Sequence, residues 1–270
     1  KKIPIILING RITENSYNKW KKLTFFSNDI FSKINLCFPS SKQSEKYLKK
    51  LGVKKIKLIG NLKFSQSENE KLLDQNKEIK KFITNKKTWC ASSTHKTEEL
   101  LCGIVHKKLK KKYKNLLTII IPRHINRSSS IMNELKGINL NTVTRSSGQK
   151  ISKNTDIYIA DTYGEASKFY ELSKITFLGG SLIKHGGQNP LEPARLGNYI
   201  LHGPNIQNFK EVYKMLSKLN ISSKASNINN MKKIILRKIE FKQTSTKIKK
   251  LNLIGNDILK RNLVEINKFL

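Results

Sequence analysis

The sequence of 270 residues contains 53 lysines and arginines against 19 aspartates and glutamates, which gives a formal net charge of +34. This charge favours polyanionic partners such as phosphorylated lipid, anionic membrane or nucleic acid, although a sequence bias toward lysine, asparagine and isoleucine explains it equally well. Three widely spaced cysteines without a CxxC pair argue against a disulfide framework and a zinc site, and no apolar run reaches the roughly 18 residues of a membrane span.

Short apolar runs alternate along the chain with amphipathic stretches. Such runs are typical of buried parallel strands, and apolar residues at every third or fourth position are typical of helices. The runs are 3–8, 56–59, 88–91, 116–121, 157–160, 175–178 and 199–201, and the helix-like stretches are 44–51, 97–113, 165–172 and 208–219. The alternation predicts a doubly wound α/β fold with a parallel sheet, which binds ligands beyond the carboxyl ends of its strands.

A polar stretch rich in lysine and glutamate, 65–81, interrupts this alternation and predicts a boundary between two lobes. We expect residues 1–64 to form the end of a first lobe, 65–255 a second lobe and 256–270 a C-terminal helix. Because the sequence opens with Lys1 rather than methionine, we expect the chain to be either processed or the tail of a longer protein, and we treat it as a fragment.

The first motif that could carry chemistry is Pro122-Arg123-His124, directly after the strongest apolar run. Pro122 has no amide hydrogen to donate and therefore ends the strand. The guanidinium of Arg123 can then make paired hydrogen bonds to a phosphate or a carboxylate. This motif indicates an anion site, or else an arginine solvated in a loop.

The second motif, Asp161-Thr162-Tyr163-Gly164-Glu165, follows another run and opens a helix. The free amides at a helix N-terminus suit a phosphate. Thr162 could equally serve only as a helix cap for Glu165. By itself the motif favours the purely structural interpretation.

The third motif comprises Gly179-Gly180-Ser181 and, further on, Asn189-Pro190-Leu191-Glu192. Adjacent glycines after a strand let the backbone approach a ligand closely. Glu192 lies in the first turn of a predicted helix, where its carboxylate can accept two ribose hydroxyls or merely complement the helix dipole. Together, the three motifs follow successive strands and predict one nucleotide-sugar site.

In order and spacing, these motifs resemble those of the Kdo transferases of lipopolysaccharide synthesis. The resemblance runs from about Asn9 to Phe209 and is carried by Asn61-Leu62-Lys63-Phe64, Ser92-Ser93-Thr94-His95, Pro122-Arg123-His124, Asp161-Thr162-Tyr163-Gly164-Glu165, Gly179-Gly180-Ser181 and Gly187-Gln188-Asn189-Pro190-Leu191-Glu192-Pro193. Three positions depart from the family pattern: Ala160, Tyr163 and Gln188 stand where Gly, Met and His are common.

The resemblance implies a GT-B glycosyltransferase with a complete C-terminal Rossmann-like lobe and the C-terminal part of the N-terminal acceptor lobe. The residues that match the family's CMP contacts are Pro122, Arg123, Tyr163, Gly164, Glu165, Asn189, Pro190, Leu191 and Glu192. Lys63 matches a residue assigned to transition-state stabilisation, where an ammonium would offset the charge on the departing phosphate.

The implied reaction moves 3-deoxy-D-manno-octulosonic acid (Kdo) from CMP-Kdo to a lipid A precursor, lipid IVA, with inversion at the anomeric carbon. The family's general-base Glu lies upstream of anything present here, so we expect the chain to be catalytically incomplete. A cationic pocket can neutralise the single phosphate, so neither a metal nor another cofactor is expected. The expected location is the cytoplasmic face of the bacterial inner membrane, against its anionic surface, with the anchor segment outside this chain.

The histidines His95, His124, His185 and His202 lack metal-ligand spacing. We interpret them as loop or surface residues, with His95 and His124 as candidate neighbours of the donor site. Two alternative functions stay open: another GT-B enzyme that uses a UDP-sugar, and a basic nucleic-acid-binding protein. The eleven Phe and eight Tyr do not cluster with Lys and Arg as nucleic-acid binding would favour, so no nucleic acid is expected as a partner.

Overall fold

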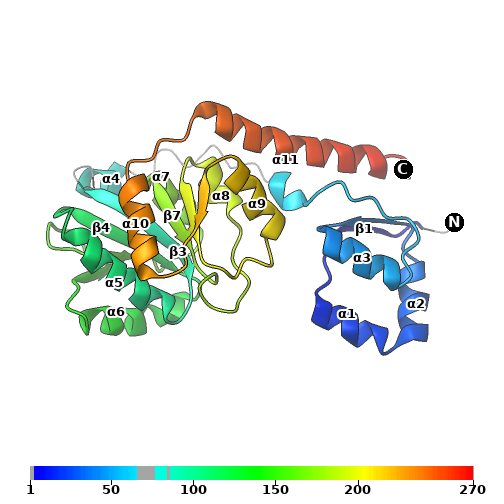
Figure 1. Ribbon diagram of the computed structural model, residues 1–270, viewed down its shortest axis with the longest axis horizontal. Helices are drawn as coiled ribbons and strands as arrows, with labels where there is room; N and C mark the ends of the chain where they lie inside the picture. Colours follow the sequence, from blue (N-terminus) through cyan, green and yellow to red (C-terminus); the bar gives the residue numbers. More distant parts are fainter. Residues whose placement is uncertain (1–2, 66–76, 84–85, 270) are drawn as a thin grey trace. The chain divides into compact units, whose positions relative to one another are not determined.

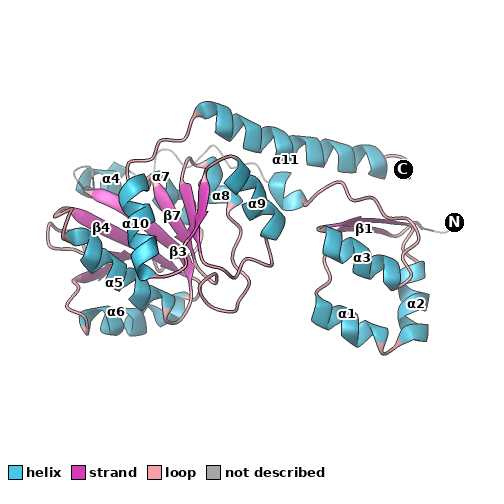
Figure 2. Cartoon of the chain, viewed as in Figure 1, coloured by secondary structure: helices cyan, strands magenta, loops and turns pink. Residues whose placement is uncertain are grey.

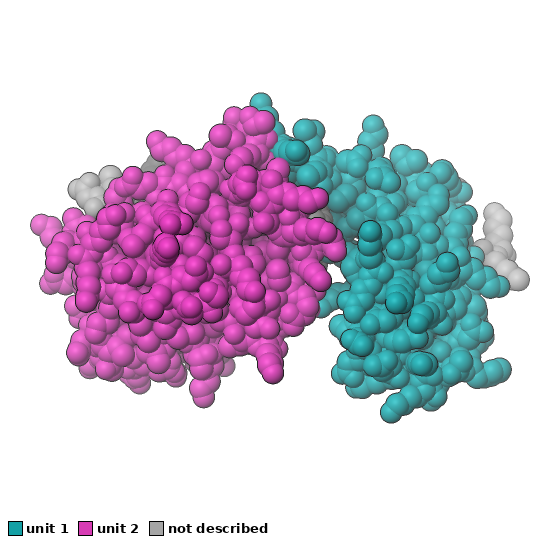
Figure 3. All heavy atoms as spheres, viewed as in Figure 1, with its two compact units in different colours: residues 1–67, 249–270 teal, residues 68–248 magenta. Residues whose placement is uncertain are grey.

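The computed structural model describes residues 3–65, 77–83 and 86–269. The chain divides into two compact units (Figure 3): unit 1 comprises Lys1–Ser67 and Lys249–Leu270, and unit 2 comprises Glu68–Ile248. None of the helices in the described part of the chain combines the length and the apolar character needed to span a bilayer.

Unit 1 is built on a small parallel sheet of two strands, β1 (Ile6–Gly10) and β2 (Leu36–Pro39). Its helices are α1 (Glu14–Lys21), α2 (Thr24–Ser32), α3 (Lys42–Lys50), the 3-10 helix η1 (Leu62–Ser65) and α11 (Ser245–Ile266), which starts in unit 2. α3 begins after Ser41, whose side chain accepts a hydrogen bond from the amide of Ser44 at 3.1 Å. The core consists of Ile12, Cys37, Leu48, Leu51 and Val53.

Two expectations for unit 1 were wrong. The run 3–8 was expected to form a buried strand, yet Ile3, Ile5 and Ile8 are 86%, 52% and 46% exposed, because within the described residues the sheet of β1 has only two strands. The run 56–59 was also expected to be a strand, but it makes only an isolated bridge between Ile56 and Cys37.

The C-terminal helix is longer than expected and begins at Ser245 instead of at position 256. Its buried residues Leu251, Gly255, Ile258 and Asn262 recur at steps of four and three, which is the spacing of one helix face. Leu251 and Gly255 precede position 256, so the buried face of the helix already begins in the segment that was not expected to be helical.

Unit 2 contains a seven-stranded sheet in which every neighbouring pair of strands is parallel (Figure 1). The strands lie in the order β5-β6-β4-β3-β7-β8-β9. Their bounds are β3 (Lys87–Thr94), β4 (Leu116–Pro122), β5 (Thr142–Thr144), β6 (Ile157–Ile159), β7 (Ile175–Leu178), β8 (Tyr199–His202) and β9 (Ser222–Lys224). The predicted α/β fold with a parallel sheet is confirmed, and the two outermost strands, β5 and β9, were not anticipated.

Helices cover both faces of this sheet (Figure 2). The helices are α4 (Lys77–Ile83), α5 (Glu98–Lys110), α6 (Ser128–Lys136), α7 (Ala166–Glu171), α8 (Leu191–Arg195), α9 (Lys210–Lys218) and α10 (Ile228–Lys238), with a 3-10 turn, η3, at Ile125–Arg127. Along β3, Trp89 and Ala91 pack into the core beneath α5, α6 and α10, whereas Cys90 packs into the core beneath α4 and α7. This alternation of buried side chains places the sheet in the middle layer and leaves the ends of its strands open to ligands.

Candidate functional site

All three motifs lie at the edge of the unit 2 sheet where its strands end, called here the carboxyl edge. The motif strands β6, β4 and β7 flank β3 in the order β6-β4-β3-β7, so the loops that follow them are neighbours. Hydrogen bonds link the motif loops to the end of β3, which lies between β4 and β7: Arg123 N–H, after β4, donates to the carbonyl of Thr94 at 2.9 Å, and Gly179 N–H, after β7, donates to the carbonyl of Ser92 at 2.8 Å. The sheet therefore brings the three motifs to one edge.

Arg123 is held by its backbone, and its side chain is exposed. Pro122 ends β4 in register with Thr94, as expected from its missing amide hydrogen. Within the described ranges the Arg123 guanidinium makes no hydrogen bond or ion pair, unlike Arg127, which pairs with buried Glu99 at 2.8 Å. Arg123 is therefore a cation available to an anionic ligand.

Glu98 is the anchor of this edge, and the sequence motifs did not include it. Its side chain is 0% exposed, and its carboxylate accepts hydrogen bonds from four backbone amides. The donors are the amides of His95 at 3.0 Å, Gly180 at 2.7 Å, Ser181 at 3.2 Å and Leu182 at 3.0 Å. Of these four bonds, only the one from His95 is local: the carboxylate of Glu98 accepts from an amide three positions earlier, as in a capping box, and sequence reasoning could have anticipated this bond. The other three bonds lie more than eighty positions away.

Gly179 lies against this anchor. A Cβ added to it would lie 2.4 Å from the carbonyl oxygen of Ser93 and 2.8 Å from a carboxylate oxygen of Glu98. Only glycine fits such a close approach. The glycine pair after β7 thus serves to bring two loops together.

The loop after β6 is rigidly held by its acidic residues. The carboxylate of Asp161 accepts hydrogen bonds from the amide of Ser146 at 2.9 Å and from its hydroxyl at 2.6 Å. Tyr163 is 79% exposed, and Gly164 adopts φ +78° with open space around the position of a Cβ. The backbone at Gly164 is thus accessible to a ligand.

Glu165 already has three side-chain partners within the protein. Arg145 donates to its carboxylate at 3.2 and 3.3 Å, Lys168 donates at 2.8 Å, and the Thr162 hydroxyl donates as well. Burial alone would raise the pKa of Glu165, but these hydrogen bonds outweigh it and lower the pKa to about 2. Thr162 therefore contacts the Glu165 side chain and does not cap a helix, and α7 begins only at Ala166.

The loop that leads to α8 is fixed through its glycines. Gly187 N–H donates to the carbonyl of Gly180 at 2.8 Å, and the carbonyl of Gly186 accepts from Asn208 N–H at 3.0 Å. A Cβ on Gly186, which has φ +107°, would lie 2.4 Å from the Asn208 side chain. These contacts hold the segment that contains Asn189 against the carboxyl edge.

Asn189, Pro190, Leu191 and Glu192 form the start of α8. The side chain of Asn189 accepts a hydrogen bond from the amide of Leu191 at 3.2 Å, and Pro190 is the N-cap. Glu192 is accessible to solvent, but its surroundings remove enough water from the carboxyl to raise its pKa. Burial raises the pKa of the Tyr170 hydroxyl most, and the nearby carboxylate of Glu192 raises it as well. Tyr170 bonds to Ser92, near the end of β3, at 2.7 Å.

Three of the five histidines gather at the same edge. The ring of His95 lies 4.3 Å from that of His185 and 5.9 Å from that of His124, measured between centroids. Sequence reasoning placed His95 and His124 near the donor site but did not include His185. His202 was expected in a loop or on the surface, which is wrong, because it ends β8 and is only 6% exposed. No His, Cys, Asp or Glu group suited to a metal ion occurs among the residues that the structure describes.

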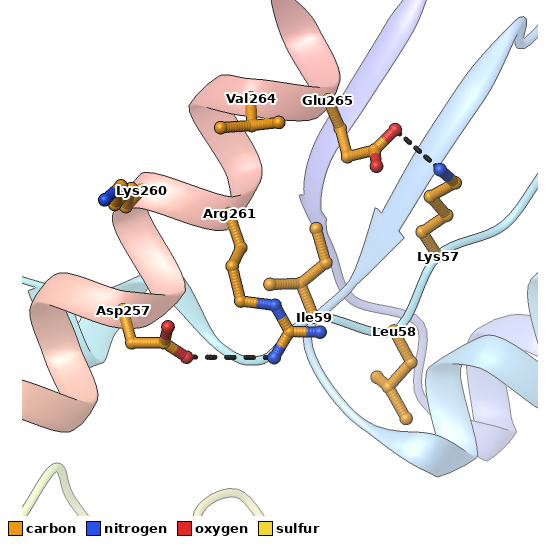
Figure 4. A pocket seen from close by; sticks show the side chains of 8 residues that line it. All are labelled: Lys57, Leu58, Ile59, Asp257, Lys260, Arg261, Val264 and Glu265. Carbon is orange, nitrogen blue, oxygen red and sulfur yellow. Dashed lines mark hydrogen bonds and ion pairs between the residues drawn. The ribbon is translucent and has the colours of Figure 1, made fainter.

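Lys63 lies in unit 1, in η1, and its side chain falls outside the described residues. Unit 1 also contains an open hollow of about 540 Å³ beside α11 (Figure 4). It is lined by Lys57, Leu58, Ile59, Asp257, Lys260, Arg261, Val264 and Glu265. Lys57 pairs across the hollow with Glu265 at 2.6 Å, and Arg261 pairs with Asp257 one turn earlier on α11 at 3.7 Å, so most of the charges that line it are paired.

Residues 1–66 match the family model described as 3-deoxy-D-manno-octulosonic-acid transferase (kdotransferase). The chain is 32% identical over 219 residues to the 3-deoxy-D-manno-octulosonic acid transferase of Haemophilus influenzae, an alignment that covers 80% of this chain and 51% of that protein. It is 35% identical over 233 residues to the enzyme of the same name from Rickettsia prowazekii, covering 83% and 48%. The chain thus spans about half the length of these curated relatives.

Solved structures give a similar result. The C-terminal CMP-Kdo binding domain of WaaA from Acinetobacter baumannii has a TM-score of 0.59 and 28% identity, covering 68% of this chain and 96% of that domain. The superposition with the trehalose-6-phosphate synthase OtsA covers 99% of this chain and 65% of the OtsA chain, with a TM-score of 0.55 and 9% identity. The second likeness concerns the fold alone.

Proposed function

The chain belongs to the Kdo transferase family and has the α/β fold of GT-B glycosyltransferases, and from this premise we propose that unit 2 binds CMP-Kdo at its carboxyl edge. One observation supports this most strongly: Arg123 presents a guanidinium without a protein partner among the described residues, between the loops that follow β6 and β3. A phosphate is the natural partner of such a group.

In this proposal, the phosphate lies against Arg123 and the accessible backbone of Gly164, next to Pro122 and Tyr163. The carboxylate of Glu165 acts mainly by fixing this loop, because Arg145 and Lys168 already occupy it. On the other side of β3, the segment of Asn189, Pro190 and Leu191 flanks the nucleotide, and Glu192 accepts hydrogen bonds from the ribose hydroxyls. The raised pKa of Glu192 fits a carboxylate that meets its hydroxyl donors only when the ligand binds.

The whole enzyme, we propose, transfers Kdo from CMP-Kdo to a lipid A precursor at the cytoplasmic face of the inner membrane. Lys63 would stabilise the negative charge that develops on the departing CMP. A base must also accept the proton of the attacking hydroxyl, and we assign that role to no residue of this chain. The net charge of +34 is compatible with an anionic membrane surface as a partner.

Calorimetric titration of CMP and UDP into the purified chain tests this proposal. We expect CMP to bind more tightly than UDP, and Arg123→Ala to weaken CMP binding by about tenfold or more, since hydrogen bonds to charged groups are worth about 1.5–3 kcal/mol. The melting temperature should not change, because the side chain of Arg123 makes no hydrogen bond or ion pair with the described part of the protein. Lys111→Ala is the matched control, since Lys111 is exposed and caps the far end of α5.

Two other results would contradict the proposal. Tighter binding of UDP would indicate a GT-B enzyme with a UDP-sugar donor. Binding of neither nucleotide, together with strongly salt-dependent binding of nucleic acid, would support the basic nucleic-acid-binding protein instead.

A further inference from the structure

Three imidazoles from three different loops form a cluster at the carboxyl edge, called here the histidine cluster. It consists of His95 after β3, His124 after β4 and His185 after β7. The ring centroids of His95 and His185 are 4.3 Å apart, and those of His95 and His124 are 5.9 Å apart. The amide nitrogen of Gln188 lies 3.4 Å from Nε2 of His95 and extends the cluster toward α8.

The cluster converges on a backbone position without a side chain. A Cβ built on Gly180 would lie 3.1 Å from His185 Nδ1, 3.3 Å from His95 Nε2 and 3.4 Å from the Gln188 amide nitrogen. Three side-chain nitrogens thus face one small space above Gly180, and any side chain there would fill it. Because the Gln188 NH2 group and a histidine ring nitrogen in its N–H tautomer both donate hydrogen bonds, this space suits an oxygen-rich acceptor.

The surroundings of the histidine cluster are cationic. No carboxylate within the described ranges lies at ion-pair distance from its rings, and the nearby carboxylate of Glu98 is engaged by four amides. Burial and, to a smaller extent, the nearby His185, His124 and Arg123 together lower the pKa of His95 to about 4. An anion is therefore the ligand that the electrostatics of this space favour.

We propose that the histidine cluster binds the carboxylate of the donor sugar and thereby selects an acidic sugar. This inference rests on the proposed function, which assigns the phosphate to Arg123 and Gly164. In an octulosonic acid the anomeric carbon bears both the carboxylate and the bond to the phosphate, so two anion sites must lie side by side. Arg123 meets this requirement, because its charge lies close enough to the ring of His95 to lower the pKa of that ring.

Comparing the affinities of the full 270-residue chain for CMP-Kdo and for CMP tests this inference, because only CMP-Kdo carries the carboxylate. In the double variant His124→Ala, His185→Ala, we expect the affinity for CMP-Kdo to fall by about 10- to 100-fold and that for CMP to change by less than about twofold. Both residues are exposed, so the variant should keep the melting temperature of the parent. The variant with glutamine at both positions keeps N–H donors and should recover part of the affinity.

The outcomes separate this inference from the proposed function. Equal losses for CMP-Kdo and CMP would mean that the cluster binds the phosphate, and unchanged affinity for both would mean that it binds neither group; each result overturns the inference and leaves the CMP site standing. Failure of the unmodified chain to bind either ligand would overturn the proposed function, and the inference with it. Lys111→Ala again controls for the truncation of an exposed side chain to alanine.

Discussion

Replacing Glu98 by glutamine should destabilise unit 2 strongly. Each carboxylate oxygen of Glu98 accepts two backbone amides, with Gly180 and His95 on one oxygen and Ser181 and Leu182 on the other. Glutamine keeps one acceptor oxygen and turns an NH2 group toward the other two amides, which then have no acceptor.

The magnitude follows from those two amides. A buried donor left without a partner costs about 1–3 kcal/mol, so Glu98→Gln should lower the free energy of unfolding by about 2–6 kcal/mol. For a unit of this size, 1 kcal/mol corresponds to about 2–4 °C, which predicts a fall in melting temperature of roughly 4–24 °C. Glu98→Ala removes all four acceptor contacts and should cost more.

Thermal unfolding followed by circular dichroism measures this change. Glu134→Gln on α6 is the matched control: Glu134 is partly exposed, and among the described residues its carboxylate accepts a single long hydrogen bond, 3.3 Å, from Ser130, so the free energy should change by less than about 0.5 kcal/mol. Hydrogen exchange adds a local measurement, since in Glu98→Gln one pair of amides, either His95 and Gly180 or Ser181 and Leu182, should lose protection. A loss below about 1 kcal/mol with all four amides still protected would refute the role of Glu98 as an anchor.

Three further changes have expected results. Gly179→Ala should destabilise unit 2 by about 1–3 kcal/mol or more in urea unfolding, because its Cβ would lie 2.4 Å from a backbone oxygen; Gly137→Ala, whose Cβ meets only ordinary contacts from 3.4 Å, should not destabilise. Arg145→Ala should raise the pKa of Glu165 from about 2 toward 4.5, as an NMR titration of the carboxyl would show. Glu165 contributes stability above pH 4.5 that is lost as the pH falls toward 2, and this variant should lose less. Burial lowers the pKa of His106 below its usual 6.5. As the pH falls below 6.5, His106 is therefore protonated in the unfolded chain before it is protonated in the folded chain, so the free energy of unfolding should decrease. The variant His106→Gln should make this free energy less dependent on pH between about pH 7.5 and 5.5.

Each of these expectations can fail on its own. Equal stabilities of the two alanine variants would show that the loops near Gly179 can move apart without cost. An unchanged pKa of Glu165 in Arg145→Ala would mean that its other partners dominate. Identical pH profiles of His106→Gln and the parent would assign the acid sensitivity to other groups.

The sequence by itself determined the α/β class and the edge at which the motifs meet. Apolar runs such as 116–121 specify strands through local periodicity, and the placement of Pro122 and Arg123 after a strand follows from chain order alone. In a parallel sheet every strand ends at the same edge, so motifs that follow strands must lie there.

Only the tertiary structure decided which groups at that edge are available. Glu165 was expected to contact CMP, but Arg145, twenty positions earlier, already bonds to its carboxylate, whereas the side chain of Arg123 has no such partner within the described residues. Glu98 bonds to a loop more than eighty positions away, and the histidine cluster draws on three loops. Such contacts join residues far apart in the chain, and local periodicity carries no information about them; strand order and packing set them.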